Sequence, residues 1–197
     1  MLDFFDIPYL LITFGYTGIF VIIFLESGIF FPLPGDSLLF TGGLFAATIG
    51  LNIYFLLVVV FVATFLGGLA GYQVGVYLYK LHDYSFFRIF LKKEHIDRAH
   101  IFFEKHGQFA IMFCRFIPII RTFTPIVAGV AKMNYREFVK YNTYGSLIWT
   151  LLITLLGFFL GHVFPEIQNH LSWIIVLIVL ISFLPFLLKL RPKRRAK

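Results

Sequence analysis

Charged residues are scarce in this sequence, and their scarcity sets the class of protein. Only 14% of the 197 residues are charged, whereas 59% are hydrophobic; a soluble domain carries about 25% charged residues. No charge interrupts the stretches 37–79, 141–165 and 167–188. A spanning helix needs about 20 apolar residues, so each of the last two stretches fits one span, and the first also has room for a hairpin arm. The sequence therefore predicts an all-α polytopic membrane protein.

Cysteine and N-terminal basic residues are also nearly absent. The single cysteine, Cys114, excludes an internal disulfide and leaves the redox compartment undetermined. The first residues include Asp3 and Asp6 but no Lys or Arg, whereas a secretory signal begins with basic residues. We expect the N-terminal segment to be part of the mature protein.

Basic residues give a net charge of +7, and apart from Arg115 and Arg121 they are concentrated in three segments. They lie at 80–106, at 132–140 and in the tail 189–197. Lys and Arg gather in this way in cytoplasmic loops of membrane proteins, where they also contact anionic lipid head groups. We therefore expect no nucleic-acid partner, a cytoplasmic connector at 80–107 and a cytoplasmic C-terminus.

Four histidines of the connector do not form a metal-binding pattern. They lack the i, i+4 pairing and the accompanying carboxylate of a helical zinc site. A solvated amphipathic connector is the simpler interpretation, and we expect neither a metal nor a cofactor. The histidines are His82, His95, His100 and His106.

Two arginines and two prolines interrupt an otherwise apolar stretch at 108–130. They are Arg115, Pro118, Arg121 and Pro125. An arginine at the bilayer centre costs about 2.5–3.5 kcal/mol on insertion scales, and proline prevents one continuous helix. Broken backbone at this depth is tolerated only where protein covers it or where it lines a wet cavity. We predict a re-entrant hairpin at 108–130, in which Thr124 caps a short half-helix that starts at Pro125.

A similar break occurs in the first half of the chain. An apolar arm reaches Glu26, and two prolines and a glycine then stop it before Asp36 and Ser37. Either Asp36 or Ser37 can cap the next helix, at about 37–48, which is too short to cross a bilayer. We predict a first re-entrant hairpin at 14–48.

The two hairpins form an inverted repeat within a single membrane domain. With the connector and the tail inside, the hairpins enter from opposite faces, a common plan in transporters whose site lies at the midplane. The N-terminus then lies outside; it lies inside if 9–30 crosses instead. The expected units are a first repeat at 1–79, the connector at 80–107, a second repeat at 108–163, a last span at 172–189 and a basic tail at 190–197.

Four charges are expected to converge between the hairpins. Glu26 and Asp36 come from the first hairpin, and Arg115 and Arg121 come from the second. Unpaired in hydrocarbon, they would cost on the order of 10–14 kcal/mol, which is comparable to the net stability of a whole fold. They must pair, become protonated or face water, and buried ion pairs that lock the hairpins together are one interpretation.

A phosphate-binding site is the other interpretation of these charges. Arginine binds phosphate in a bidentate manner, and helix N-termini near Ser37 and Thr124 add partial positive charge. A carboxyl group in a low dielectric is easier to protonate, so an acid of the first hairpin can carry a proton. The pattern fits an anionic lipid head group whose movement is coupled to protons.

Two blocks of residues resemble the DedA family, also described as the VTT or SNARE-associated domain family. The first block is Glu26-Ser27-Gly28 followed by Phe31-Pro32-Leu33-Pro34-Gly35-Asp36-Ser37-Leu38-Leu39, and the second runs from Phe113-Cys114-Arg115-Phe116-Ile117-Pro118 through Arg121-Thr122, Pro125, Ala128-Gly129, Met133, Tyr135, Phe138, Tyr141-Asn142 and Gly145 to Trp149. The resemblance implies an inner-membrane protein with two re-entrant hairpins, in which Glu26, Asp36, Arg115 and Arg121 are needed for activity. It also implies lipid flipping or scrambling, including return of undecaprenyl phosphate, and dependence on the proton-motive force.

The sequence departs from the family pattern at two places. Ile119 and Ile120 stand where many relatives have a glycine, and the spacing from Glu26 to Asp36 is shorter than in some members. These departures leave the identity of the lipid open.

We predict a lipid transporter of the flippase or scramblase type, located in the cell (inner) membrane, and not an enzyme. Its cargo would be a phosphate-bearing lipid such as undecaprenyl phosphate or a phospholipid. The expected substrate-binding residues are Arg115, Arg121, Ser37 and Thr124, and the expected proton-coupling residues are Glu26 and Asp36.

Three alternatives remain open at this point. A proton-coupled small-ion or drug antiporter could use the same acids. A membrane phosphatase would need a histidine near the arginines, but His106 and His162 lie at segment ends. A structural assembly role and a homo-oligomeric state are also compatible with the sequence.

Overall fold

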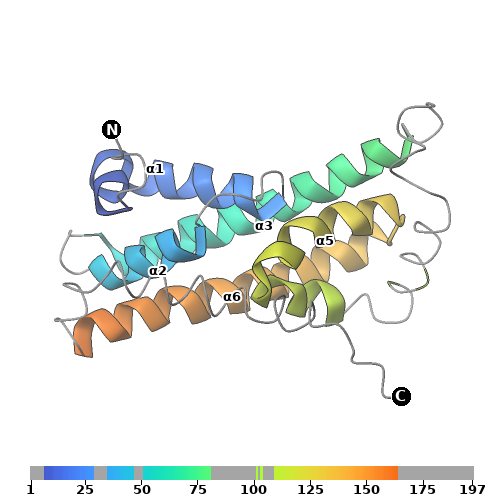
Figure 1. The fold of residues 1–197 in the computed structure, drawn as a ribbon. Helices are drawn as coiled ribbons and strands as arrows, with labels where there is room; N and C mark the ends of the chain where they lie inside the picture. Colours follow the sequence, from blue (N-terminus) through green and yellow to red (C-terminus); the bar gives the residue numbers. More distant parts are fainter. Residues whose placement is uncertain are drawn as a thin grey trace, which may run out of the picture.

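The computed structural model describes residues 7–28, 35–46, 51–80, 101, 103 and 109–163. Within these residues every element is helical (Figure 1). The elements are α1 (Ile7–Gly28), α2 (Gly35–Phe45), α3 (Ile53–Lys80), the short 3₁₀ helix η4 (Cys114–Phe116), α5 (Pro118–Val130) and α6 (Tyr135–Val163). The expected last span at 172–189, the tail at 190–197 and the four connector histidines lie outside the described residues.

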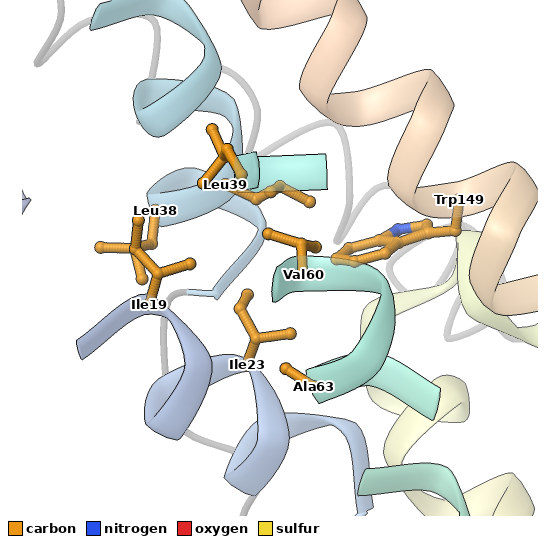
Figure 2. Packing of buried hydrophobic residues seen from close by; sticks show 8 residues of the cluster. Ile19, Ile23, Leu38, Leu39, Val60, Ala63 and Trp149 are labelled. Carbon is orange, nitrogen blue, oxygen red and sulfur yellow. The ribbon is translucent and has the colours of Figure 1, made fainter. Parts of the chain in front are cut away.

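Two helices of the described part, α3 and α6, are long and apolar enough to cross a membrane. They contain 28 and 29 residues, which corresponds to roughly 42 Å at 1.5 Å per residue. The two helices are antiparallel, since the side-chain amide of Asn142 early in α6 donates to the carbonyl of Phe65, while Trp149 packs near Val60 (Figure 2). The sequence predicted a membrane span within each of the uncharged stretches 37–79 and 141–165, and α3 and α6 are helices long and apolar enough to be those spans.

Helix α1 packs parallel to α3. The backbone N–H of Asn52 donates to the hydroxyl of Tyr16 near the start of both helices, and Gly28 at the end of α1 touches the backbone of Gly67 and Gly71. A break at Gly15, with a φ of 52°, divides α1 and allows the second part to turn along α3. The part of α1 that follows Gly15 thus begins beside the start of α3 and ends at Gly28, beside the second half of α3.

Helix α2 packs against α6 through glycines and runs parallel to it. Phe40 touches Gly157, and Leu44, one turn later, touches Gly161. Because α3 and α6 are antiparallel, α2 runs opposite to α1 and returns toward the end of the bundle where α3 begins. Figure 1 shows α1 and α2 together over one half of the long helices.

Helix α5 packs on the other half of α3, again through glycines. Pro125 lies against Gly71, and Gly129 lies against Gly75 one turn later, so α5 runs parallel to α3. The helix starts at Pro118, directly after the 3₁₀ turn η4, and Pro125 lies inside it. The prediction that Thr124 caps a half-helix starting at Pro125 was therefore wrong, because Pro118 occupies the first position, where a missing N–H costs little.

Two apolar clusters fill the bundle on either side of its middle. The first joins α1, α2 and α3 to Trp149 of α6 (Figure 2). The second joins α3 to α5, α6 and the segment before η4, and it includes Phe103, which the sequence placed in the solvated connector. The clusters contain Ile19, Ile23, Leu38, Leu39, Leu56, Val60, Ala63 and Trp149 in one case, and Tyr72, Phe103, Ile111, Ala128, Ala131, Met133 and Phe138 in the other.

The contact between α3 and α5 predicts a strong effect of one added methyl group. A Cβ at Gly75 would lie 2.0 Å from the carbonyl oxygen of Ile126, so the two backbones would have to separate. We expect Gly75→Ala to lower the free energy of unfolding by about 1–3 kcal/mol, measured by thermal unfolding in detergent. Val74→Ala, on the exposed side of the same turn, is the control and should change little; equal stability of both variants would contradict this packing.

Candidate functional site

An ion pair joins the two halves of the chain near the middle of the bundle. The Arg121 guanidinium on α5 bonds to the carboxylate of Glu26 on α1. The two residues are only 4% and 5% exposed. Removing one partner of such a buried pair leaves an uncompensated charge, which costs about 3–5 kcal/mol. The structure thus brings together two of the four charges that the sequence predicted to converge.

Neighbouring groups hold this pair in place. The hydroxyl of Thr122 donates to the backbone carbonyl of Glu26 at 3.0 Å, which fixes the end of α1 to α5. The guanidinium carbon of Arg121 lies 4.7 Å from the centre of the Trp149 ring on α6, in the range of a cation–π interaction. Gly28 lets the end of α1 approach so closely, since a Cβ there would lie 1.8 Å from the Gly67 carbonyl oxygen.

Arg115 lies in the 3₁₀ turn η4 and is also buried, being 4% exposed. Among the described residues, its hydrogen-bonding partner is the side-chain oxygen of Asn142 on α6. The amide nitrogen of Asn142 donates to the Phe65 carbonyl at 3.1 Å, so the oxygen is directed at the arginine. Within the described part of the chain, Arg115 is thus held by a neutral group and not by a carboxylate.

Two glycines form the slot in which the Arg115 side chain lies. A Cβ at Gly68 would lie 3.0 Å from a terminal nitrogen of Arg115 and 2.3 Å from the Asn142 oxygen. A Cβ at Gly145 would lie 3.1 Å from the Cδ of Arg115. The space between α3, α6 and η4 therefore fits the arginine. Any side chain larger than glycine at position 68 or 145 would displace Arg115.

The remaining predicted site residues are placed differently. Asp36 and Ser37 lie in the first turn of α2, and their side chains are outside the described part of the structure. Thr124 lies inside α5, and its hydroxyl donates to the carbonyl of Ile120 at 2.7 Å. The structure therefore does not place Thr124 at a helix N-terminus.

Two residues of the site were not predicted from the sequence, namely Asn142 and Trp149. Both stand in the second block that carries the family resemblance, but neither is charged, and only a charge in an apolar stretch signals a buried functional group directly. Their spacing on α6, seven residues apart, is two helical turns and could have indicated a common face.

The described side chains of the site are suited to binding an anion. Among the described side chains at the site, one guanidinium group, that of Arg121, contacts the carboxylate of Glu26, and the other, that of Arg115, contacts the neutral amide of Asn142. No group of three or more His, Cys, Asp or Glu side chains able to hold a metal occurs within the described residues. The described histidine, His162, is exposed at the far end of α6, away from both arginines.

Comparisons with known proteins identify the family of this chain. The family model for the VTT domain matches residues 33–159. The chain is 39% identical to protein DedA of Escherichia coli K12 over 186 residues, which cover 92% of this chain and 84% of DedA. It is 32% identical to undecaprenyl phosphate transporter A of Staphylococcus aureus, over 92% of this chain and 93% of the relative.

A third relative carries a different kind of name. The alkaline phosphatase-like protein of Lactococcus lactis is 35% identical over 190 residues, covering 92% of this chain and 88% of the relative. No solved structure matches the chain significantly. The matched domain and the identity to DedA over most of both chains show that this protein belongs to the DedA family of VTT-domain membrane proteins.

Proposed function

We propose that this protein is a transporter of the flippase or scramblase type that moves a phosphate-bearing lipid across the cell membrane. The observation that carries the proposal is the buried Glu26–Arg121 pair between the two halves of the chain, close to an Arg115 held by a neutral amide. Undecaprenyl phosphate and phospholipids both carry the phosphate that such arginines bind. A relative named as an undecaprenyl phosphate transporter supports the same class of substrate.

The proposed membrane arrangement is an inverted repeat with two re-entrant hairpins. Support comes from the helix directions: α1 enters beside the start of α3 and α2 returns there, whereas α5 runs toward the opposite end of α3. Glu26 and Arg121 then meet where the hairpin tips overlap. In this arrangement the protein is multi-pass in the inner membrane, and its basic C-terminus is cytoplasmic.

In the proposed mechanism the phosphate competes with Glu26 for Arg121. Protonation of Glu26 weakens the ion pair and releases the guanidinium, which then binds the phosphate together with Arg115. Asp36 is the second proposed proton-coupling group, and Ser37 is a proposed contact to the head group. Thr124 can donate to a phosphate only after it gives up its bond to Ile120.

Glu26→Gln tests the proton-coupling step. Wild-type transport is expected to rise as the pH falls, because protonation of Glu26 frees Arg121. Glutamine imitates the protonated carboxyl group, so transport by the variant should lose this pH dependence. The measurement is the flipping rate in proteoliposomes over a range of pH values, and a variant with the wild-type pH profile would exclude Glu26 as the coupling group.

The substrate class is tested by reconstitution with defined lipids. A membrane-impermeant phosphatase reports how much undecaprenyl phosphate or phosphatidic acid reaches the outer leaflet, and empty liposomes give the background. Movement of protons or small ions without any phosphate lipid would favour an antiporter instead. Release of inorganic phosphate by the protein itself would favour an enzyme, as the name of the alkaline phosphatase-like relative suggests for that protein.

A further inference from the structure

A row of polar residues follows one face of α6. Ser146, Thr150 and Thr154 continue at four-residue intervals from Asn142, and all four are at most 1% exposed. Residues four apart lie on one face of a helix. The row therefore leads from the partner of Arg115 to the part of α6 that contacts α2.

The hydroxyls of this row differ in their hydrogen bonds. Ser146 donates to the backbone carbonyl of Asn142 at 2.6 Å, and Thr143, on another face of α6, donates in the same way to Val139 at 2.8 Å. The buried hydroxyls of Thr150 and Thr154 make no such bond and have no partner among the residues described. Although the bond to the preceding turn is open to a helical threonine, these two hydroxyls do not make it, and buried hydroxyls generally bond to another group or to ordered water.

Two further threonines lie on the helices that cover the row. Thr41 on α2 and Thr64 on α3 are at most 1% exposed, and within the described part of the chain their hydroxyls have no partner. Gly43 touches the backbone of Thr154, which sets Thr41 near the level of that end of the row. The carbonyl of Phe65 accepts from the amide that begins the row, which sets Thr64 near the other end.

We propose that these threonines bind a chain of water molecules between α6 and the helices α2 and α3. Ordered water satisfies buried polar groups in proteins, typically through about three hydrogen bonds each. This hydrated lane, lined by Thr41, Thr64, Thr150 and Thr154, runs past Trp149, whose ring contacts Arg121. It gives protons a path to the ion pair.

The hydroxyls without a partner among the described residues of α6 lie on one side of Arg115 only. On the other side of Arg115 the core is the second apolar cluster, in which the hydroxyl of Tyr72 is already bonded to the Met133 carbonyl at 2.6 Å. In this proposal water and protons approach the ion pair along the row from the side of Thr154 and not through the second apolar cluster. The proposal of a hydrated lane does not depend on which lipid is transported, and it can be tested without measuring transport.

Thermal unfolding of Thr150→Val and Thr154→Val in detergent tests the lane. Valine has nearly the shape of threonine, so packing is kept while the hydroxyl is lost. If the hydroxyls bind water, each variant should lower the Tm by about 2–4 °C, and Thr143→Val, whose hydroxyl bonds within its own helix, should change it less. An unchanged or higher Tm in either variant would overturn the lane, because removing a dry, unpartnered hydroxyl is neutral or stabilising.

Thiol labelling provides the measurement if a valine variant does not fold. In a Cys114→Ser background, Thr150→Cys and Thr154→Cys are compared with Leu151→Cys and Leu152→Cys, which lie at similar depth on the exposed face of α6. A small anionic methanethiosulfonate reacts with a thiol in contact with water far faster than with one in lipid. We expect at least about tenfold faster labelling at the two threonine positions; rates no higher than at the leucine positions would overturn the lane.

Discussion

Arg121→Ala is expected to abolish lipid transport while the protein remains inserted in the membrane. The substitution removes the guanidinium that would bind the phosphate, and truncating one partner of a buried charge pair costs about 2–5 kcal/mol, or roughly 30- to 5000-fold in rate. Glu26 is then left buried at the contact between α1 and α5. The measurement is flipping of the phosphate lipid by purified variant in proteoliposomes.

The double variant Glu26→Gln, Arg121→Gln separates the binding role from the structural one. It removes both charges together, so no unpaired ion is buried and stability should largely recover. If Arg121 only locks the two halves together, this variant should transport as the wild type does. Wild-type transport by either the alanine or the double variant would remove Arg121 from the site.

Asn142→Asp is expected to inactivate transport without loss of stability. Aspartate has the shape of asparagine, but it would give Arg115 a carboxylate partner in place of a neutral one. The new ion pair would compete with the phosphate, so the flipping rate should fall by about 10- to 100-fold, equivalent to about 1.4–2.7 kcal/mol. The bond from the amide nitrogen to Phe65 is lost, while the stronger charge-assisted bond to Arg115 offsets it.

Asn142→Ala is the matched comparison for this prediction. It leaves Arg115 without its oriented partner and opens space beside Gly68, so the Tm should fall. A stable, inactive aspartate variant beside a destabilised alanine variant would identify Asn142 as the residue that keeps Arg115 available to anions. An aspartate variant with wild-type transport would contradict that role.

The sequence predicted the long helices, the charged residues of the site and their convergence, but not the neutral partners Asn142 and Trp149. Charges inside apolar stretches are rare enough to identify Glu26, Arg115 and Arg121 directly. Which groups they contact depends on how far each hairpin reaches along the long helices, and that distance is set by backbone contacts of glycines such as Gly28. No local pattern encodes such a register.

The start of α5 was mispredicted for a local reason. Thr124 followed by Pro125 is a common pattern for a helix N-terminus. The helix begins instead at Pro118, which also suits the first helical position, although Ile117 before it has no capping side chain. An internal proline removes one backbone hydrogen bond, and helix-breaking residues are tolerated in membrane helices where neighbouring groups compensate. Here Pro125 fits against Gly71 of α3, a contact that only the tertiary structure provides.

The glycine contacts have a consequence for how the two halves of the chain assemble. The short helix α2 of the first half packs on α6 of the second, and α5 of the second half packs on α3 of the first. Each half therefore covers a helix face that the other half leaves unpacked. In a fragment that ends after Lys80, the face of α2 that packs on α6 would be exposed to lipid. We therefore expect neither this fragment nor the remaining C-terminal fragment to be stable alone. When the two fragments are expressed together, they should associate. In the proposed transport cycle we therefore expect movement at the tips where Glu26 and Arg121 meet, and not a large separation of the two halves.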